Sequence, residues 1–308
     1  MGYWKGWGEE VQPIELIVGR RNDLGGKAAN LGWLLEQHER VPKTWAVRPH
    51  LAQAELAASV DRDLVPDGIY AVRSSANVED GQNLSYAGQF GSELDVPAAD
   101  VAAAVQRIRA SAESERVTEY VRRLEAGADI SVTVLVQPMV QPVVSGVAFS
   151  RNPITGLNEV VVEAVAGRGD QLVGEGVTPE RWIHRWGSWV ETASTGVLPE
   201  SVVTELVNDT SRIAADIGSP VDLEWVWDGS QVWWVQLRPI TGLSEVAIYS
   251  NRISREVMPG IIKPLVWSVN VPIVNRAWVD LFTEAIGPND LRPSDLAKSF
   301  AYRSYFNM

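Results

Sequence analysis

The stretch 221–239, VDLEWVWDGSQVWWVQLRP, constrains the fold more than any other part of the chain. Val, Leu and Trp supply β-forming bulk on both sides of Asp228-Gly229-Ser230, and Asp-Gly is a strong signal for a hairpin turn. The stretch therefore predicts two antiparallel strands joined by a short loop.

The polar residues of this hairpin fall into two pairs. Side chains alternate between the faces of a strand, so Asp222 shares a face with Glu224, and Gln236 shares a face with Arg238. A two-residue Asp-Gly turn would pair Glu224 with Trp233 and separate the two polar pairs. A three-residue loop would pair Asp222 with Gln236 and gather them. We favour the three-residue loop, because it collects two acids, an amide and a guanidinium on one face.

Such a collection has a recognisable chemistry. Carboxylate oxygens suit Mg²⁺, and the guanidinium fork of Arg suits phosphate. The four residues could therefore hold a divalent metal and a polyphosphate. On strand chemistry alone, the alternative is an edge hairpin with a solvated polar face, since antiparallel sheets commonly expose one face to water.

Composition narrows the class of protein. The 308 residues suggest one large domain or two ordinary ones, and a net charge of −12 argues against nucleic acid or an anionic membrane surface as the main partner. The chain has no cysteine, which excludes disulfides and thiolate metal sites. The first ten residues, MGYWKGWGEE, lack the apolar core of a signal peptide, and no stretch approaches the roughly 20 apolar residues of a membrane span. We expect a soluble cytoplasmic protein.

Two further stretches suit an anion. Gly25-Gly26-Lys27 opens an expected helix that runs to about residue 37, and the free N–H groups of a helix start beside a Lys favour a phosphate. The spacing of a Walker motif is absent, and an ordinary glycine cap is the alternative. Arg73 leaves an expected strand at 68–72 and enters a Ser-rich loop, where it is placed to meet an anion.

The remaining pattern is mixed α/β. Helices are expected at 51–62 and 199–217, and 97–126 is expected to form one helix or two. Strands are expected at 130–136, 143–149, 160–165 and 181–191, the last as a pair. After residue 241 the character changes. The stretch 267–286 reads as a helix that is broken at Pro272 or begins there.

Several stretches, in this order, resemble the N-terminal ATP-binding domain of the phosphoenolpyruvate synthase / pyruvate phosphate dikinase family. They are GGKAANLG (25–32), AVRSSANVED (71–80), SYAGQF (85–90), VQPMV (136–140), SGVAFSRNPITG (145–156), VVEAVAGRGDQLVGEGVTPE (161–180) and DLEW with VQLRPIT (222–241). Each is modest, but the ordered set is specific and spans about residues 20–241. The tail, NRISREVMPGIIKPLVWSV (251–269), resembles the segment that follows this domain in rifampin-phosphotransferase-like members.

The resemblance implies an α/β, ATP-grasp-like fold with two subdomains and a nucleotide cleft between them. We expect a small subdomain at about 1–92, a large subdomain at 93–243, and a short C-terminal helical segment at 244–308. That last segment would begin a second, incomplete domain or serve as a docking segment.

The resemblance also implies a role for single residues, with ATP and Mg²⁺ as cofactors. Arg238, Lys27 and Arg73 are the expected catalytic, phosphate-contacting residues. The expected ATP contacts are Lys27, Arg73, Gly88, Ser92, Gln137, Met139, Val140, Glu224, Gln236 and Arg238, with Gln137, Met139 and Val140 forming the adenine hinge. The expected metal residues are Glu224 and Gln236, supported by Asp222.

In the family, ATP phosphorylates a histidine on a mobile domain and ends as AMP, with its terminal phosphate released. This chain has only three histidines, His38, His50 and His184, and none lies in the Gly- and Thr-rich context of that carrier. We therefore expect a kinase or dikinase-type phosphotransferase component, incomplete without a phospho-histidine carrier domain on another chain. Pyruvate or a small-molecule alcohol would be the final acceptor. The alternative is a non-catalytic nucleotide-binding module or a truncated remnant.

Overall fold

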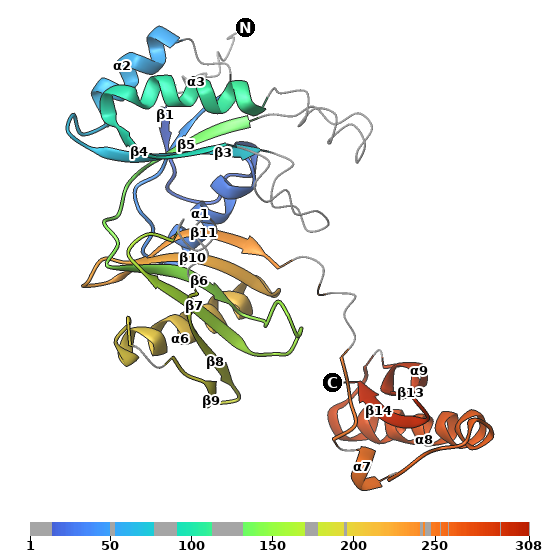
Figure 1. Cartoon of the computed structure of the whole chain (residues 1–308). Coiled ribbons are helices and arrows are strands. Elements are labelled where there is room, and N and C mark those ends of the chain that lie inside the picture. Colours follow the sequence, from blue (N-terminus) through green and yellow to red (C-terminus); the bar gives the residue numbers. More distant parts are fainter. Residues whose placement is uncertain are drawn as a thin grey trace, which may run out of the picture. The chain divides into compact units, whose positions relative to one another are not determined.

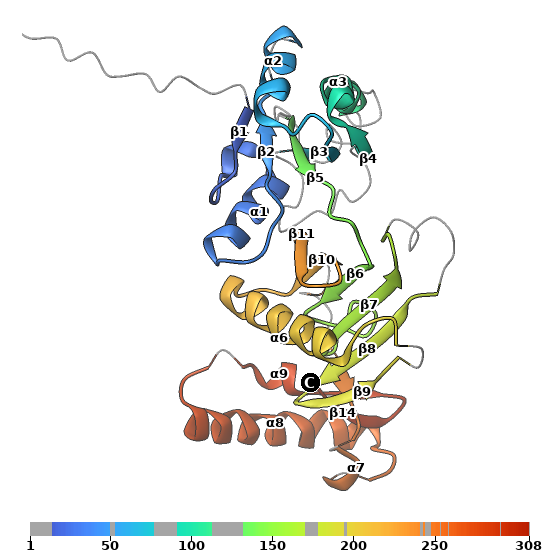
Figure 2. The same cartoon turned by 90° about the vertical axis from the view of Figure 1, so that its left-hand side faces the viewer.

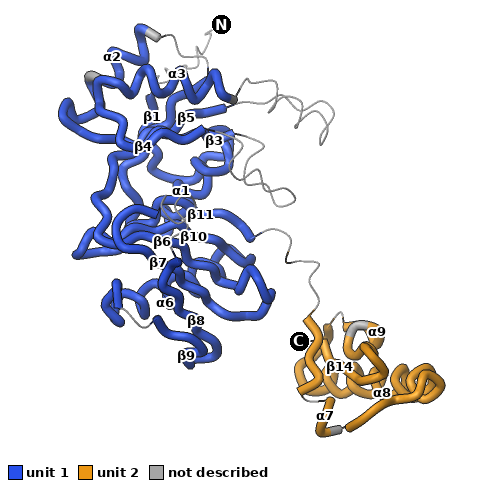
Figure 3. The backbone as a smooth tube through the Cα atoms, viewed as in Figure 1, with its two compact units in different colours: residues 1–241 blue, residues 242–308 orange. Residues whose placement is uncertain are grey.

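The computed structural model describes residues 14–49, 53–76, 91–112, 132–169, 178–193, 196–240, 243, 248–252, 254–257, 259–289 and 291–307. The chain divides into two compact units, residues 1–241 and 242–308 (Figures 1 and 3). Each unit is taken by itself below.

The first unit contains two antiparallel sheets. The first sheet has five strands in the order β1-β2-β5-β3-β4. Its strands are β1 (Ile14–Leu16), β2 (Trp45–Val47), β3 (Ile69–Ala76), β4 (Ser92–Pro97) and β5 (Val132–Pro138). Its helical elements are η1 (Asn22–Leu24), α1 (Gly26–Glu36), α2 (Gln53–Asp63), η2 (Ala98–Asp100) and α3 (Val101–Ala112).

Alternation along β5 explains how helices cover both faces of this sheet. Val134 and Val136 point to one face and pack in a core with residues of α2 and α3, including Leu56 and Val105. Leu135 points to the other face and joins a core with residues of α1. Figure 2 shows α2 and α3 on one side of the strands and α1 on the other. The same alternating run therefore serves two cores.

The second sheet has six strands in the order β11-β10-β6-β7-β8-β9, all antiparallel. They are β6 (Val144–Phe149), β7 (Val160–Ala166), β8 (Glu180–Arg185), β9 (Ser188–Glu191), β10 (Val221–Trp227) and β11 (Val232–Pro239). Helix α6 (Glu200–Ile217) shares one hydrophobic core with this sheet, to which the helix contributes Leu206 and Ile213 and the sheet contributes Trp225. The helix ends at Gly218, whose φ of 77° is the usual left-handed C-terminal stop. Glu224 and Val147, which lie opposite one another on β10 and β6, line the cavity described below.

The hairpin forms as expected, but its register differs from the prediction. Glu224, not Asp222, lies opposite Gln236, and Asp222 lies opposite Arg238. The ladder pairs Trp227 with Val232, which leaves a loop of four residues, 228–231. An even loop alone would separate the polar pairs, but a β-bulge beside Val235 adds one residue and restores the shared face.

This architecture confirms the predicted mixed α/β fold of two subdomains. The change from the first sheet to the second lies between β5 and β6, so β4, which begins at Ser92, and β5 both belong to the first sheet. The boundary between the two compact units lies after residue 241, close to the expected boundary at 243. The three-domain division stays a prediction.

The second unit contains more than the helical segment that the sequence predicted. Its helices are α7 (Ser254–Val257), α8 (Pro264–Ile286) and α9 (Pro293–Leu296), and its strands β12 (Tyr249–Ser250), β13 (Ala297–Phe300) and β14 (Arg303–Asn307) form a three-stranded sheet. The aromatic residues near the end form strands by packing edge-to-face, as Phe300 does on Tyr305. Helix α8 begins at Pro264, where a proline needs no N–H partner, and runs on through Pro272 without a break. Among the described helices, none is long and apolar enough for a bilayer crossing.

Candidate functional site

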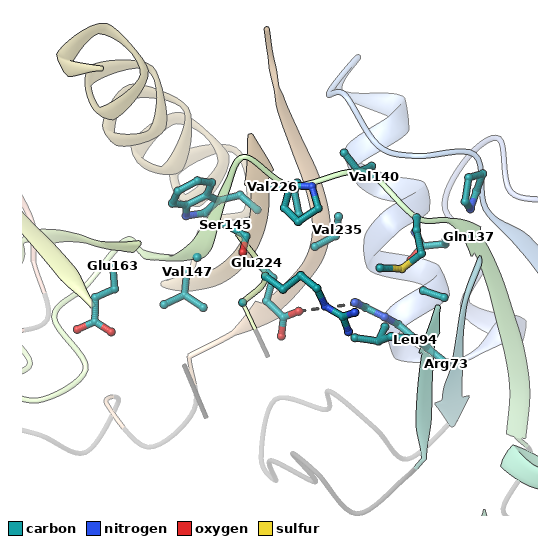
Figure 4. Close-up of a pocket in the computed structure, with 18 of the residues that line it drawn as sticks. Arg73, Leu94, Gln137, Val140, Ser145, Val147, Glu163, Glu224, Val226 and Val235 are labelled. Carbon is teal, nitrogen blue, oxygen red and sulfur yellow. Dashed lines mark ion pairs between the residues drawn. The ribbon is translucent and has the colours of Figure 1, made fainter. Parts of the chain in front are cut away.

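The candidate site is a cavity of about 600 Å³ within the first unit, lined by residues of both sheets and of the connection between β5 and β6 (Figure 4). Its lining residues are Ala71, Arg73, Leu94, Gln137, Pro138, Met139, Val140, Pro142, Ser145, Gly146, Val147, Glu163, Arg168, Gly169, Pro179, Glu224, Trp225, Val226, Val235 and Arg238. Six of the residues predicted for the site are among them.

Three charged side chains converge in the cavity, and a fourth lies behind them. The Nη2 atom of Arg238 is 3.2 Å from Oε1 of Glu224 and 3.2 Å from Oδ2 of Asp222. The Nη1 atom of Arg73, from the other sheet, is 3.8 Å from Oε2 of Glu224. Figure 4 shows Arg73 and Glu224 pointing toward one another. Two guanidinium groups therefore share two carboxylates at the junction of the sheets.

This charged cluster has unused hydrogen-bonding capacity. Oδ1 of Asp222 and the Nε atoms of Arg73 and Arg238 are buried and have no hydrogen-bond partner in the described part of the chain. Burial raises the pKa of Asp222 to about 6; Arg238 opposes this shift and the charge of Glu224 adds to it. Buried polar groups without partners are costly, so a polar ligand that bonds to them gains from the arrangement.

The cavity also has an apolar side. Met139 and Val140 from the connection after β5 line it together with Val226 and Val235 of the hairpin and Leu94 of β4. Such walls suit a flat, apolar ligand group.

Two polar groups at the predicted hinge are already satisfied within the protein. Nε2 of Gln137 donates to Oγ1 of Thr44 at 2.8 Å, and the N–H of Met139 donates to the carbonyl of Ile69 at 2.8 Å. The N–H of Val140 has no such partner among the described residues. A hydrogen-bond acceptor of a ligand at this end would therefore meet the N–H of Val140 rather than that of Met139, which contributes to the cavity lining in other ways.

Four other predicted residues lie outside the cavity lining. Lys27 donates from Nζ to the carbonyl of Ser74 at 3.2 Å, beside Arg73. Ser92 lies directly opposite Arg73 in the β3–β4 ladder. Gln236 lies opposite Glu224 and is buried, and Asp222 lies opposite Arg238.

Gly88 lies outside the described residues. The start of α1, predicted to suit an anion, is partly occupied by the protein itself. Oγ of Ser75 accepts from the N–H of Ala28 at 3.1 Å and donates to the carbonyl of Leu24 at 2.9 Å. One of the N–H groups of this helix start is therefore already used.

The sequence interpretation did not single out several lining residues. Glu163 is the lone charged residue in the apolar strand β7, and that break in the pattern is a signal that could have identified it. Arg168 follows the same strand and pairs with Asp95 of β4. Leu94, Val147, Val226 and Val235 are apolar residues, and nothing in a sequence distinguishes such wall residues from core residues.

The donor set fits Mg²⁺ only with help from a ligand. In the described part of the chain, no group of three or more His, Cys, Asp or Glu side chains is placed to hold a metal. Mg²⁺ usually takes one or two carboxylates, with water and substrate phosphates completing six oxygens. Gln236 lies opposite Glu224, and Asp222 lies two residues before Glu224 on the same strand. Together they offer two carboxylates and an amide oxygen as ligands.

The fold and cavity thus define a mixed α/β protein with a charged cavity, the candidate site, at the junction of its two sheets. Residues 50–196 match the family described as pyruvate phosphate dikinase, AMP/ATP-binding domain. This match confirms the resemblance predicted from the sequence.

Relatives with named activities extend the match. The chain is 33% identical over 236 residues to a phosphoenolpyruvate synthase of Pyrococcus furiosus, covering 63% of this chain and 29% of that protein. It is 32% identical over 253 residues to a rifampicin phosphotransferase of a Streptomyces species, covering 68% of this chain and 29% of that protein. The chain therefore spans less than a third of the length of these relatives.

Among solved structures, a D-alanine–D-alanine ligase of Helicobacter pylori superposes with a TM-score of 0.43 at 10% identity. The superposition covers 73% of this chain and 58% of the ligase.

Proposed function

We propose that this chain binds Mg²⁺-ATP in the cavity and is the ATP-binding component of a phosphotransferase of the phosphoenolpyruvate synthase or rifampicin phosphotransferase type. The observation that carries the proposal is the meeting of Arg73, Glu224 and Arg238 in a cavity that also has an apolar wall at Met139 and Val140. Guanidinium groups suit polyphosphate, and the apolar wall suits a planar base. The match of residues 50–196 to an AMP/ATP-binding domain supports the same ligand.

The cluster suggests how these side chains would act on a phosphate chain. Phosphoryl transfer depends mainly on positioning and on neutralising negative charge. Arg238 would exchange its two carboxylate partners for phosphate oxygens, and Arg73 would contact the same chain from the first sheet. That exchange leaves Glu224, with Gln236 and Asp222, free to hold Mg²⁺. The bound metal would supply further charge neutralisation between the phosphates.

We assign supporting roles to the residues of the first sheet and of the hinge. Lys27, Gly88 and Ser92 would contact the phosphates, and Gln137, Met139 and Val140 would hold the adenine. Lys27 is anchored next to Arg73 through Ser74, which supports the first assignment.

The phosphoryl acceptor would be a carrier histidine on another domain or chain, with pyruvate or a small-molecule alcohol as the final acceptor and AMP and phosphate as products. Two findings support this. The chain spans less than a third of the relatives that bear these names. Of the histidines that the structure describes, His38 and His184, neither lines the cavity.

Calorimetric titration with Mg²⁺-ATP tests the proposal. We expect the wild-type chain to bind, and Glu224→Gln and Arg238→Ala to bind at least about tenfold more weakly, because each loses a charged contact. Arg62→Ala is the matched control, since Arg62 pairs with Asp63 on α2, away from the cavity lining. A folded wild-type chain that does not bind Mg²⁺-ATP would refute the proposal. AMP should form only when a His-bearing domain of a phosphoenolpyruvate synthase is added.

A further inference from the structure

A row of side chains crosses the cavity face of the second sheet at the level of Glu224. The strand register pairs Gln236 with Glu224, Glu224 with Val147, Val147 with Glu163, and Glu163 with Arg181. Residues directly opposite one another on antiparallel strands point to the same face, so these five form one continuous row. Figure 4 shows Glu163, Val147 and Glu224 side by side in this order.

Glu163 is therefore the second carboxylate that faces the cavity. Its side chain is 26% exposed, and Nε of Arg181 lies 3.7 Å from its Oε1 atom. That separation orients the carboxylate without a hydrogen bond. No hydrogen-bond donor of the described residues reaches Glu163, and Nε of Arg181 is itself buried without one. The carboxylate keeps its acceptor capacity for whatever occupies the cavity.

Glu163 is badly placed to share a metal with Glu224. Two strand spacings separate them, about 9.5 Å, whereas the ligands of Mg²⁺ lie about 2.1 Å from the ion. Val147 stands between the two carboxylates, and Arg181 attracts Glu163 to the far side. The two carboxylates would therefore contact different parts of one ligand.

The order of the lining residues along β6 indicates which part of the nucleotide Glu163 would contact. The connection after β5 enters β6 at Val144, so the apolar wall for the base lies near Ser145. The phosphate-binding cluster lies on the hairpin at Glu224 and Arg238. The sugar that joins base and phosphates would cross Val147, which Glu163 flanks on the side away from Glu224.

Resting on the function proposed above, we propose that Glu163 accepts hydrogen bonds from the ribose hydroxyls of the nucleotide and selects ribonucleotides over deoxyribonucleotides. An ionised carboxylate only accepts hydrogen bonds, and the two vicinal hydroxyls of ribose are two donors. A carboxylate that binds a ribose hydroxyl is a recurrent solution in other nucleotide-binding folds.

The test compares the affinities of ATP, 2′-deoxy-ATP and 3′-deoxy-ATP, each with Mg²⁺, by calorimetry on the full chain. The wild type should prefer ATP by about tenfold, the usual effect of one hydrogen bond to a charged group. Glu163→Ala should bind all three alike. Glu163→Gln, which has the same size and a neutral acceptor, should keep a preference of about threefold. Glu191→Ala, at an exposed carboxylate of β9, should keep the wild-type ratio.

Each outcome decides something. Equal affinities in the wild type, or an undiminished preference in Glu163→Ala, would overturn the role of Glu163 and leave the nucleotide site standing. A folded wild type that binds no ATP would overturn both proposals. Thermal unfolding checks that each variant folds. If Glu163→Ala does not fold, Glu163→Gln decides: a preference for ATP over the deoxy analogues as large as that of the wild type would overturn the role of Glu163 in ribose binding.

Discussion

At the scale of single residues, Asp222 holds a charge where burial opposes it. Its carboxylate is 19% exposed, and one oxygen has no hydrogen-bond partner among the described residues. Burial raises its pKa from 3.8 to about 6 even though Arg238 is close by. The folded state therefore binds this proton more tightly than the unfolded chain does. The resulting stability is fully present below pH 3.8 and is lost as the pH rises through 6.

Asp222→Asn tests this linkage. Without metal or nucleotide, the free energy of unfolding of the wild type should fall by about 2 to 3 kcal/mol between pH 4 and pH 7 on account of Asp222. The variant should lack that component, because Asn carries no titratable group. Urea unfolding at several pH values measures it. Glu191→Gln, at an exposed position, should keep the wild-type slope, and equal slopes for wild type and Asp222→Asn would contradict the expectation.

At the scale of elements, Asp228 explains why the hairpin loop has four residues. Its Oδ1 atom accepts from the N–H groups of Ser230 and Gln231 at 2.8 and 2.9 Å, and its Oδ2 atom accepts from the indole N–H of Trp233 at 2.8 Å. These bonds hold the pKa of Asp228 well below its usual range. The carboxylate therefore spans the whole loop and closes it after Gln231.

Asp228→Ala should destabilise the chain by about 2 kcal/mol at pH 7, because several hydrogen bonds to one charged group are lost. Since the folded-state pKa is lowered, the stabilisation is present above the ordinary pKa of an Asp and is lost as the pH falls below it. Asp228→Asn keeps the size and one acceptor, so it should cost less. Urea unfolding at pH 7 and pH 3 measures both, and an Ala variant as stable as wild type would contradict the role of the loop.

The same hairpin shows what could be predicted from the sequence. Its two strands follow from β-forming residues around Asp228 and Gly229, and its polar face follows from alternation. The register does not, because it depends on side-chain bonds across the loop and on the bulge at Val235. Arg73 could be identified from its motif. The break in the apolar run of β7 marks Glu163 as unusual, but only strand pairing shows that it shares a face with Glu224.

Strand β6 must approach its neighbours closely at Gly146. A Cβ atom there would lie 1.9 Å from the carbonyl oxygen of Glu163 and 2.9 Å from the indole of Trp225. Since the first contact is backbone, Gly146→Ala should cost about 3 kcal/mol, the upper range for overpacking. Gly167→Ala is the control, because open space surrounds Gly167 and only its φ of 76° opposes a side chain. It should cost about 1 kcal/mol. Similar losses in urea unfolding would contradict the steric argument.

At the scale of the whole molecule, the site and the second unit are separate in the chain. Every lining residue of the cavity lies before residue 240, whereas α8 and the three-stranded sheet belong to residues 242–308. The second unit has aromatic packing of its own, between Trp278 and Phe306 and between Tyr249 and Phe300. Compact units with their own cores can fold independently.

A chain that ends at Thr241 should therefore fold and bind Mg²⁺-ATP with an affinity within about twofold of the full chain, because every lining residue of the cavity belongs to the first unit. Calorimetry on both chains measures this, after circular dichroism has shown that each is folded. Glu224→Gln in the shortened chain is the matched control, and it should weaken binding as it does in the full chain. A folded shortened chain with much weaker binding would show that residues 242–308 contribute to the nucleotide site. The second unit would then act in nucleotide binding rather than in contacts with a partner or acceptor domain.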